Sequence, residues 1–188
     1  NMKGTMPIVV NDRENIDVEN FFSIGVDDEG GSYLAVKYLL ERGHKNVAIA
    51  SGEPHISVVN TKRLNGYKRA LKEHGIAFDE KYVLESPVSF EDGKAVGKMA
   101  AEREDITAIF AVADIMALGI IRGIKSCGKD VPRDISVVGF DDLSICKFTT
   151  PSLTTVRQNI FKRGESAVQI IVDVINKKEM ITKEIIMP

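Results

Sequence analysis

Short apolar runs alternate along the chain with longer segments of helical periodicity, and glycine recurs at the joints between them. An amphipathic segment at 31–42 ends at Gly43 and is followed by the apolar run 47–50. A second amphipathic segment at 61–74 ends at Gly75, with a short strand expected at 82–84. Helices and strands in this alternation are typical of βαβ units. The pattern therefore predicts an α/β fold with a mostly parallel sheet.

The second half of the chain continues the alternation and adds helix-capping signals. Ser89 and Asp92 form a capping box that begins a third helix. A fourth helix is expected from Asp114, placed as its N-cap, to about Cys127, with Gly128 as a left-handed stop. The remaining predicted elements are strands at 108–112, 135–140, 153–156 and 184–187, and a helix at about 161–176.

The chain opens with two strands that no helix separates, at 7–11 and 22–26. Parallel neighbours need a crossover connection, so these two strands are not expected to be parallel neighbours in a self-contained doubly wound domain. They either belong to the edge of a larger sheet whose earlier strands precede this chain, or form a hairpin-like edge. We favour the first alternative.

Composition and charge narrow the class of protein. The 188 residues are 44% hydrophobic and 28% charged, which is ordinary for one large globular domain or two lobes. The net charge of −2 gives no general attraction to phosphate backbones, so this piece alone is a poor candidate for binding DNA. Neither a secretory leader at 1–7 nor an apolar run of roughly 20 residues is present, which predicts a cytoplasmic protein without membrane contact. Cys127 and Cys146 are expected to be free, buried thiols.

No catalytic or metal-binding signature is found in the sequence. His44, His55 and His74 are too scattered for a metal site, and His44 is better explained as a joint residue after a helix. The segment 123–129 approaches a phosphate-binding loop, but Asp130 replaces the metal-binding hydroxyl and the segment ends a helix instead of starting one. We therefore expect no cofactor, no metal and no enzymatic activity.

Four polar residues fall at or just beyond a predicted strand end or helix turn: Asp12, Arg63, Asp141 and Gln158. Open α/β sheets bind ligands at such positions. Carboxylates accept hydrogen bonds while a guanidinium donates in a fixed plane, so together they suit vicinal hydroxyls. Taken singly, each aspartate is better explained by a turn or a cap, and Arg63 by a solvated or salt-bridged position on a helix face. Only the joint pattern predicts a ligand site.

Several motifs also occur in the order typical of one family of regulators. They are Pro7-Ile-Val-Val-Asn-Asp-Arg13, Val26-Asp-Asp-Glu-Gly-Gly31, Leu40-Glu-Arg-Gly-His44, Arg63-Leu-Asn-Gly-Tyr67, Asp114-Ile-Met-Ala-Leu-Gly119, Val131-Pro-Arg-Asp-Ile-Ser-Val-Val-Gly-Phe-Asp141 and Pro151-Ser-Leu-Thr-Thr-Val-Arg-Gln158. On these motifs the chain resembles the effector-binding domain of LacI/GalR transcription regulators.

The resemblance implies a periplasmic-binding-protein-like fold, with two doubly wound parallel-sheet lobes joined by three crossing strands. The first lobe, incomplete in this chain, would comprise 1–26 and 159–182. The second would comprise 27–158 and 183–188. A helix-turn-helix head would precede Asn1.

The resemblance further implies that the chain senses a small polar effector, with a sugar or sugar derivative favoured. Asp12 would contact the effector from the first lobe, Arg63 and Asp141 from the second, and Gln158 from a crossing strand. Two further positions at the site depart from many relatives. Ala113 stands where an asparagine is common, and Val88 where an aromatic ring is common, with Phe90 two positions on. The identity of the effector therefore stays open.

The expected partners follow from the same resemblance. Operator DNA would be bound through the missing head, and a homodimer would form through an apolar patch of Ile145, Cys146 and Phe148. Effector binding would change the orientation of the lobes and thereby the affinity for DNA. Two alternatives stay open: a solute-binding protein for sugar transport, which has the same fold, and a small-molecule enzyme, for which Asp12 and Asp141 lack a partner group.

Overall fold

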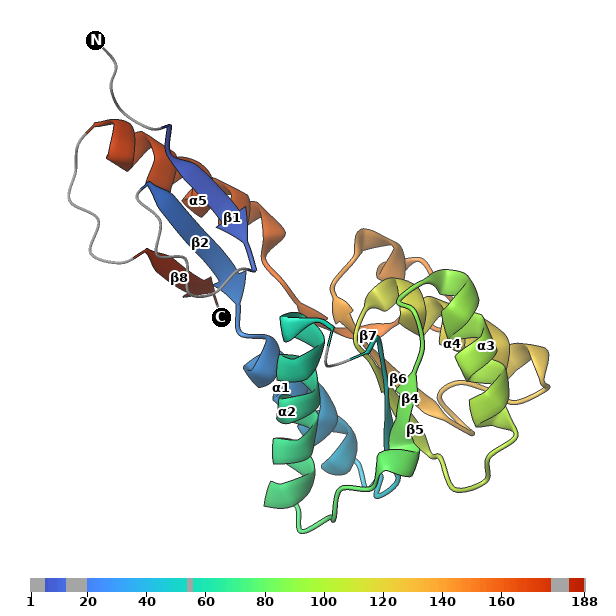
Figure 1. Ribbon diagram of the computed structural model, residues 1–188. Helices are drawn as coiled ribbons and strands as arrows, with labels where there is room; N and C mark the ends of the chain where they lie inside the picture. Colours follow the sequence, from blue (N-terminus) through green and yellow to red (C-terminus); the bar gives the residue numbers. More distant parts are fainter. Residues whose placement is uncertain (1–5, 13–19, 54–55, 177–182, 188) are drawn as a thin grey trace. The chain divides into compact units, whose positions relative to one another are not determined.

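The computed structural model describes residues 6–12, 20–53, 56–176 and 183–187. The chain divides into two compact units (Figure 1). The larger unit is Asp28–Arg157, and the smaller combines Asn1–Asp27 with Gln158–Pro188. Each unit is described by itself below.

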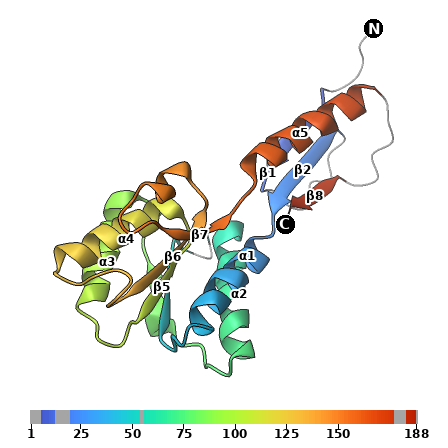
Figure 2. The same ribbon diagram turned by 180° about the vertical axis from the view of Figure 1, so that it is seen from behind.

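The larger unit is a parallel sheet of five strands in the order β4-β3-β5-β6-β7. Its strands are β3 (Val47–Ser51), β4 (Val83–Glu85), β5 (Ala108–Ala111), β6 (Ser136–Asp141) and β7 (Thr154–Arg157), and its helices are α1 (Asp28–Leu40), α2 (Val58–Glu73), α3 (Phe90–Ala101) and α4 (Asp114–Ser126). Helices α1 and α2 cover one face of the sheet while α3 and α4 cover the other (Figures 1 and 2). Strands β3 and β5 are buried along their whole length, as this double cover requires. The predicted doubly wound parallel fold is confirmed.

Most predicted helix ends in this unit are confirmed, with one correction. The Ser89 hydroxyl accepts a hydrogen bond from the Asp92 amide at 3.1 Å, and Gly128 has a φ of 80°, as expected for a left-handed stop. The N-cap of α4, however, is Ala113, which has no side chain able to cap. The prediction that Asp114 caps this helix was therefore wrong, because its carboxylate is used elsewhere.

Helices α3 and α4 approach each other unusually closely. At Gly93 and Gly97 an added Cβ would collide with backbone carbonyls of α4, and at Gly119 and Gly123 with backbone carbonyls of α3. Such contacts leave no room for a methyl group on either helix. The four glycines, at i, i+4 spacing on each helix, therefore set the distance between α3 and α4.

The smaller unit has three parallel strands in the order β1-β2-β8, with α5 (Ile160–Ile175) packed on them through Ala167. The strands are β1 (Ile8–Asn11), β2 (Phe21–Val26) and β8 (Glu184–Met187). β1 and β2 pair directly in parallel, with Ile8 beside Phe21. This pairing excludes the hairpin-like alternative, and the edge of a larger sheet stays a prediction.

Strand β8 corrects the predicted lobe boundaries. It pairs with β2 in parallel, with Ile185 beside Ile24, so 183–188 belongs with the smaller unit and not with the larger one. The other predicted boundaries lie within one residue of the observed divisions, which follow Asp27 and Arg157.

The structure also bears on two further predictions, those for the cysteines and for membrane-spanning segments. Both cysteines are free, as predicted, but Cys127 is exposed at the end of α4 and only Cys146 is buried. Within the described part of the chain, no helix combines the length and the apolar character needed to cross a membrane.

The close packing of α3 on α4 gives a stability prediction. Gly97→Ala should lower the free energy of unfolding by about 1–3 kcal/mol, because the added methyl group must push two backbones apart. Lys98→Ala, next to it on the exposed side of α3, is the matched control and should change stability by less than about 0.5 kcal/mol. Urea unfolding of both variants measures the difference. Equal midpoints would show that the two helices can separate without cost.

Candidate functional site

A hollow of about 410 Å³ lies at the carboxyl ends of β3 and β4 in the larger unit. Its lining residues are Glu53, Ile56, Ser57, Asn60, Glu85, Ser86 and Pro87. Ligands of doubly wound sheets bind at this edge, and the volume is in the range of small-molecule sites. None of the four residues predicted from strand ends lines this hollow. The hollow was not recognised in the sequence, because it depends on how two loops fold over the strand ends.

Arg63, a predicted ligand contact, is a buried residue that joins three elements. Its Nε and Nη2 atoms donate to Oδ1 of Asp28 at 2.9 and 2.7 Å, and Nη1 donates to the carbonyl of Val112. The guanidinium also lies 3.8 Å from the ring centroid of Phe140. Arg63 thus ties α2 to the start of α1 and to the end of β5. Its contact with an effector remains a prediction.

Asp141 and Asp142 end strand β6 in a backbone conformation that few residues adopt. Their φ angles are 131° and 57°. Positive φ at such residues costs about 1–3 kcal/mol and persists only where surrounding contacts hold it. One such contact is the ion pair from Asp142 to Nε of Arg157 at 2.5 Å. This strained turn at the carboxyl edge fits the predicted ligand role of Asp141.

Asp114 is a fully buried carboxylate beside the same edge. It accepts hydrogen bonds from the amide of Leu143 at 2.8 Å, from the hydroxyl of Thr155 at 2.6 Å and from the thiol of Cys146 at 3.2 Å. Burial, together with the bond to Asp114, raises the pKa of Cys146 to about 12, so the thiol keeps its proton and donates. Asp114 therefore anchors the loop after β6, a role that the sequence reading missed.

The other two predicted contacts, Asp12 and Gln158, belong to the smaller unit. Asp12 ends β1 with a φ of 54° and forms an ion pair with Arg163 of α5 at 2.5 Å. Gln158 is the first residue of the smaller unit after β7. The structure thus assigns Asp12 and Gln158 to one unit and Arg63 and Asp141 to the other, and their meeting around one ligand stays a prediction.

The three remaining predicted contacts lie at the carboxyl edge of the larger unit. Val88 is exposed directly after Pro87, which lines the hollow, and Phe90 is exposed as the first residue of α3. Ala113 is half-buried at the start of α4. Their positions agree with a site at this edge, and their contact with a ligand is untested.

The predicted dimer patch needs one correction. Ile145 and Phe148 are exposed, Phe148 to 80%, but Cys146 is only 1% exposed. Cys146 is therefore an anchor beneath the loop and was wrongly included in the patch. Leu143, which is also exposed, lies in the same loop.

At the opposite, amino edge of the sheet, polar side chains form hydrogen bonds that join neighbouring segments. His44 bonds through both ring nitrogens, to the hydroxyls of Thr107 and Ser136 at 3.0 Å each, as expected for a joint residue. Burial lowers its pKa.

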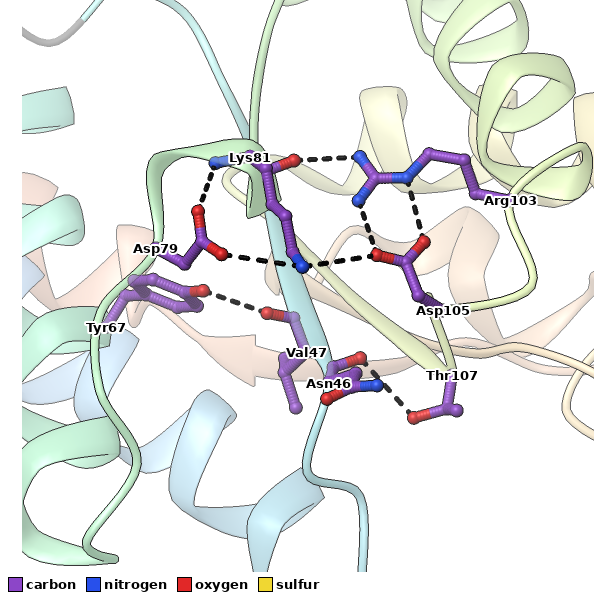
Figure 3. A network of polar contacts seen from close by, with 8 residues as sticks. All are labelled: Asn46, Val47, Tyr67, Asp79, Lys81, Arg103, Asp105 and Thr107. Carbon is purple, nitrogen blue, oxygen red and sulfur yellow. Dashed lines mark hydrogen bonds and ion pairs between the residues drawn. The ribbon is translucent and has the colours of Figure 1, made fainter.

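Beside that joint, Figure 3 shows Lys81 between the carboxylates of Asp79 and Asp105, with Arg103 donating to Asp105. The hydrogen bond from Arg103 is the largest cause that lowers the pKa of Asp105. Two cations and two carboxylates balance one another in this network. Within the described ranges, no group of histidine, cysteine, aspartate or glutamate residues is arranged to hold a metal ion.

Comparisons with known sequences point to one family of proteins. The family described as periplasmic binding protein-like domain matches residues 36–188. The chain is 42% identical over 158 residues to the HTH-type transcriptional regulator MalR of Clostridium butyricum, covering 82% of this chain and 46% of that protein. It is 35% identical over 182 residues to the HTH-type transcriptional repressor PurR of Haemophilus influenzae, covering 94% and 52%. The chain thus spans about half the length of the curated relatives it matches.

Solved structures show the same likeness. A LacI family transcriptional regulator from Enterococcus faecium with bound ribose aligns with a TM-score of 0.86 at 30% identity, covering 97% of this chain and 67% of that one. The complex of the transcriptional regulator CelR with cellobiose aligns with a TM-score of 0.85 at 29% identity, covering 95% and 55%.

The buried ion pair gives a second stability prediction. Arg63→Ala should lower the free energy of unfolding by about 3–5 kcal/mol, because the buried carboxylate of Asp28 loses its ion pair with Arg63. Arg69→Ala, on the same helix, removes an exposed pair with Glu29 and should cost less than about 1 kcal/mol. Chemical denaturation followed by circular dichroism compares the two. If both variants unfold at the same denaturant concentration, the pair does not hold the helices as described.

Proposed function

The chain belongs to the periplasmic-binding-protein-like domain family of LacI/GalR transcription regulators, and from this premise we propose that it is the effector-sensing, dimerising part of a repressor. The observation that carries the proposal is the hollow at the carboxyl edge of the larger unit, in a fold whose solved relatives hold ribose and cellobiose. The proposed effector is accordingly a small, hydroxyl-rich molecule of the sugar class.

In this proposal the remainder of the regulator binds operator DNA. The chain has a net charge of −2, so the affinity for DNA must come from a separate head. A cytoplasmic location follows, since the regulator must reach DNA. The smaller unit forms part of a first lobe and the larger unit is the second lobe.

The proposed effector contacts are Asp12, Arg63, Asp141 and Gln158, with Val88, Phe90 and Ala113 around them. Asp12 and Asp141 both have positive φ angles at strand ends, which supports a functional role. Arg63 carries more N–H donors than its bonds to Asp28 and Val112 use, so it has donors left for an effector hydroxyl.

The proposal also includes a homodimer that forms through the loop after β6. Ile145 and Phe148 present an exposed apolar surface there, and Asp114 holds the loop from beneath. Because α4 begins at Asp114, a displacement of this helix start by an effector would reach the dimer surface through a single buried carboxylate. Coupling of this kind typically changes an affinity by about 5- to 150-fold.

The regulators among the relatives support this reading over sugar transport and over catalysis. We propose that no chemical step occurs at the site, since the relatives are transcription regulators. Recovery of an altered sugar after incubation with the protein would revive the enzyme alternative.

Titration calorimetry with ribose, maltose and cellobiose tests the proposed site. At least one of these sugars should bind the protein. Asp141→Asn should weaken that binding by about 10- to 150-fold, the range expected when a charged acceptor is lost. Asp79→Asn, in the amino-edge network, should leave binding unchanged. Absence of binding by all three sugars, or equal affinities for the two variants, would contradict the proposal.

Sedimentation of the intact regulator tests the dimer surface. The unaltered protein should be a dimer at micromolar concentration, and Phe148→Glu should yield monomers because it puts a charge in an apolar contact. Leu34→Glu, an exposed position on α1, is the control and should leave the dimer intact. A monomeric unaltered protein, or dissociation by both variants alike, would refute this role for the loop.

A further inference from the structure

A second hollow, of about 480 Å³, lies at the amino edge of the sheet in the larger unit. The segments that lead into three neighbouring strands, β3, β5 and β6, bound it, and all of them lie in the described part of the chain. Its volume is in the range of small-molecule sites. The lining residues that decide its chemistry are Arg42, His44, Lys45, Thr107, Arg133 and Asp134. We call it the amino-edge hollow.

Two of its three cationic side chains face no carboxylate. The ammonium group of Lys45 forms no hydrogen bond or ion pair with any described residue. Arg42 donates from Nη1 to the carbonyl of Tyr38 at 3.2 Å, and its guanidinium lies 3.4 Å from the centroid of the Tyr38 ring. These contacts hold the guanidinium of Arg42 without neutralising its charge.

The third cation, Arg133, is only loosely paired. It lies 3.8 Å from carboxylate oxygens of Asp130 and Asp134, and its side chain is 75% exposed. Pairs of this length at the surface contribute little. Asp134, the single carboxylate in the lining, also accepts a hydrogen bond from the amide of Asp130 at 2.6 Å. The carboxylate of Asp134 therefore offsets at most one of the three cations.

The nearby end of helix α1 does not account for the remaining charge. The free carbonyls at a helix C-terminus carry about half a negative elementary charge, which cationic side chains stabilise. The bond from Arg42 to the carbonyl of Tyr38 has this role. Half a charge and one carboxylate together are fewer than three cations. The lining therefore keeps an excess of positive charge.

The backbone around the hollow is held by neutral hydrogen bonds. The ring nitrogens of His44 bond to the hydroxyls of Thr107 and Ser136 at 3.0 Å each, and burial lowers the pKa of His44, so the ring is uncharged at neutral pH. The hydroxyl of Thr107 donates to the carbonyl of Asn46 at 3.3 Å (Figure 3). These bonds join the segments before β3, β5 and β6, so the cations project from a fixed base.

We propose that the amino-edge hollow is a second ligand site, which binds a small oxyanion with two or more negative charges. Lys45 supplies a compact charge, while Arg42 and Arg133 present planar forks that match the oxygens of a phosphate or carboxylate group. The site lies at the opposite edge of the sheet from the proposed effector site. It is independent of the proposed function, since sugar binding and anion binding use different residues.

Titration calorimetry of the intact protein with pyrophosphate, citrate and acetate, in metal-free buffer of about 0.05 M ionic strength, tests the site. Pyrophosphate or citrate should bind with a dissociation constant below about 1 mM, and acetate at least about tenfold more weakly, because it carries a single charge. Binding of pyrophosphate without citrate would assign a phosphate-bearing ligand, and binding of both would assign phosphate and carboxylate ligands alike.

Two double variants locate the binding. Lys45→Gln with Arg133→Gln should weaken it by about 5- to 25-fold, the loss of two exposed ion pairs. Lys72→Gln with Lys98→Gln removes two charges from the last turns of α2 and α3, outside the hollow, and should leave it unchanged. All four side chains belong to exposed residues, so both variants should unfold at the same urea concentration as the unaltered protein.

Three results would overturn the inference. The first is that neither pyrophosphate nor citrate binds, which would leave the cations with a role at the helix end alone. The second is that acetate binds as tightly as either. The third is that the two double variants lose affinity equally, or that the variant in the hollow loses none. Each result would leave the proposed sugar site unaffected.

Discussion

A buried guanidinium holds together the part of the larger unit on which the site depends. Arg63 reaches from α2 to Asp28 at the start of α1 and to Val112 at the end of β5, and Phe140 of β6 covers its flat face. A buried charge is tolerated only when it is paired and hydrogen-bonded. The helix starts and strand ends that surround the carboxyl edge are therefore fixed relative to one another. This arrangement also fixes the positions of Ser57, the N-cap of α2, and of Asn60 in its first turn.

A second buried charged residue at the same edge, Asp114, holds a loop in place. Asp114 takes hydrogen bonds from Leu143, Cys146 and Thr155, so the loop after β6 is tied to the start of α4. That loop presents Ile145 and Phe148 to solvent. One charged residue thus organises the proposed effector edge, and the other links this edge to the proposed dimer surface. The proposed effector edge and the proposed dimer surface are thus joined through Asp114 within the larger unit.

The element types were predictable from the sequence because hydrophobic periodicity depends on near neighbours. The capping box at Ser89 and the stop at Gly128 are local signals, and the structure confirms both. The errors concern partners that lie far apart along the chain. Asp114 bonds to Thr155, 41 residues later, so its sequence context suggested only a cap. The pairing of β8 with β2 and the exposure of Cys127 likewise depend on the tertiary fold. Asp141 ends β6 as its sequence position predicted, but the hollow at the ends of β3 and β4 had no local signal in the sequence.

We propose above that a sugar bound by this chain controls the affinity of the repressor for DNA. The most direct measurement is the affinity of the intact regulator for its own promoter DNA, at fixed salt, with and without the sugar that the chain binds. We expect saturating sugar to change this affinity by about 5- to 150-fold. An unchanged affinity for DNA, with the sugar demonstrably bound, would contradict it.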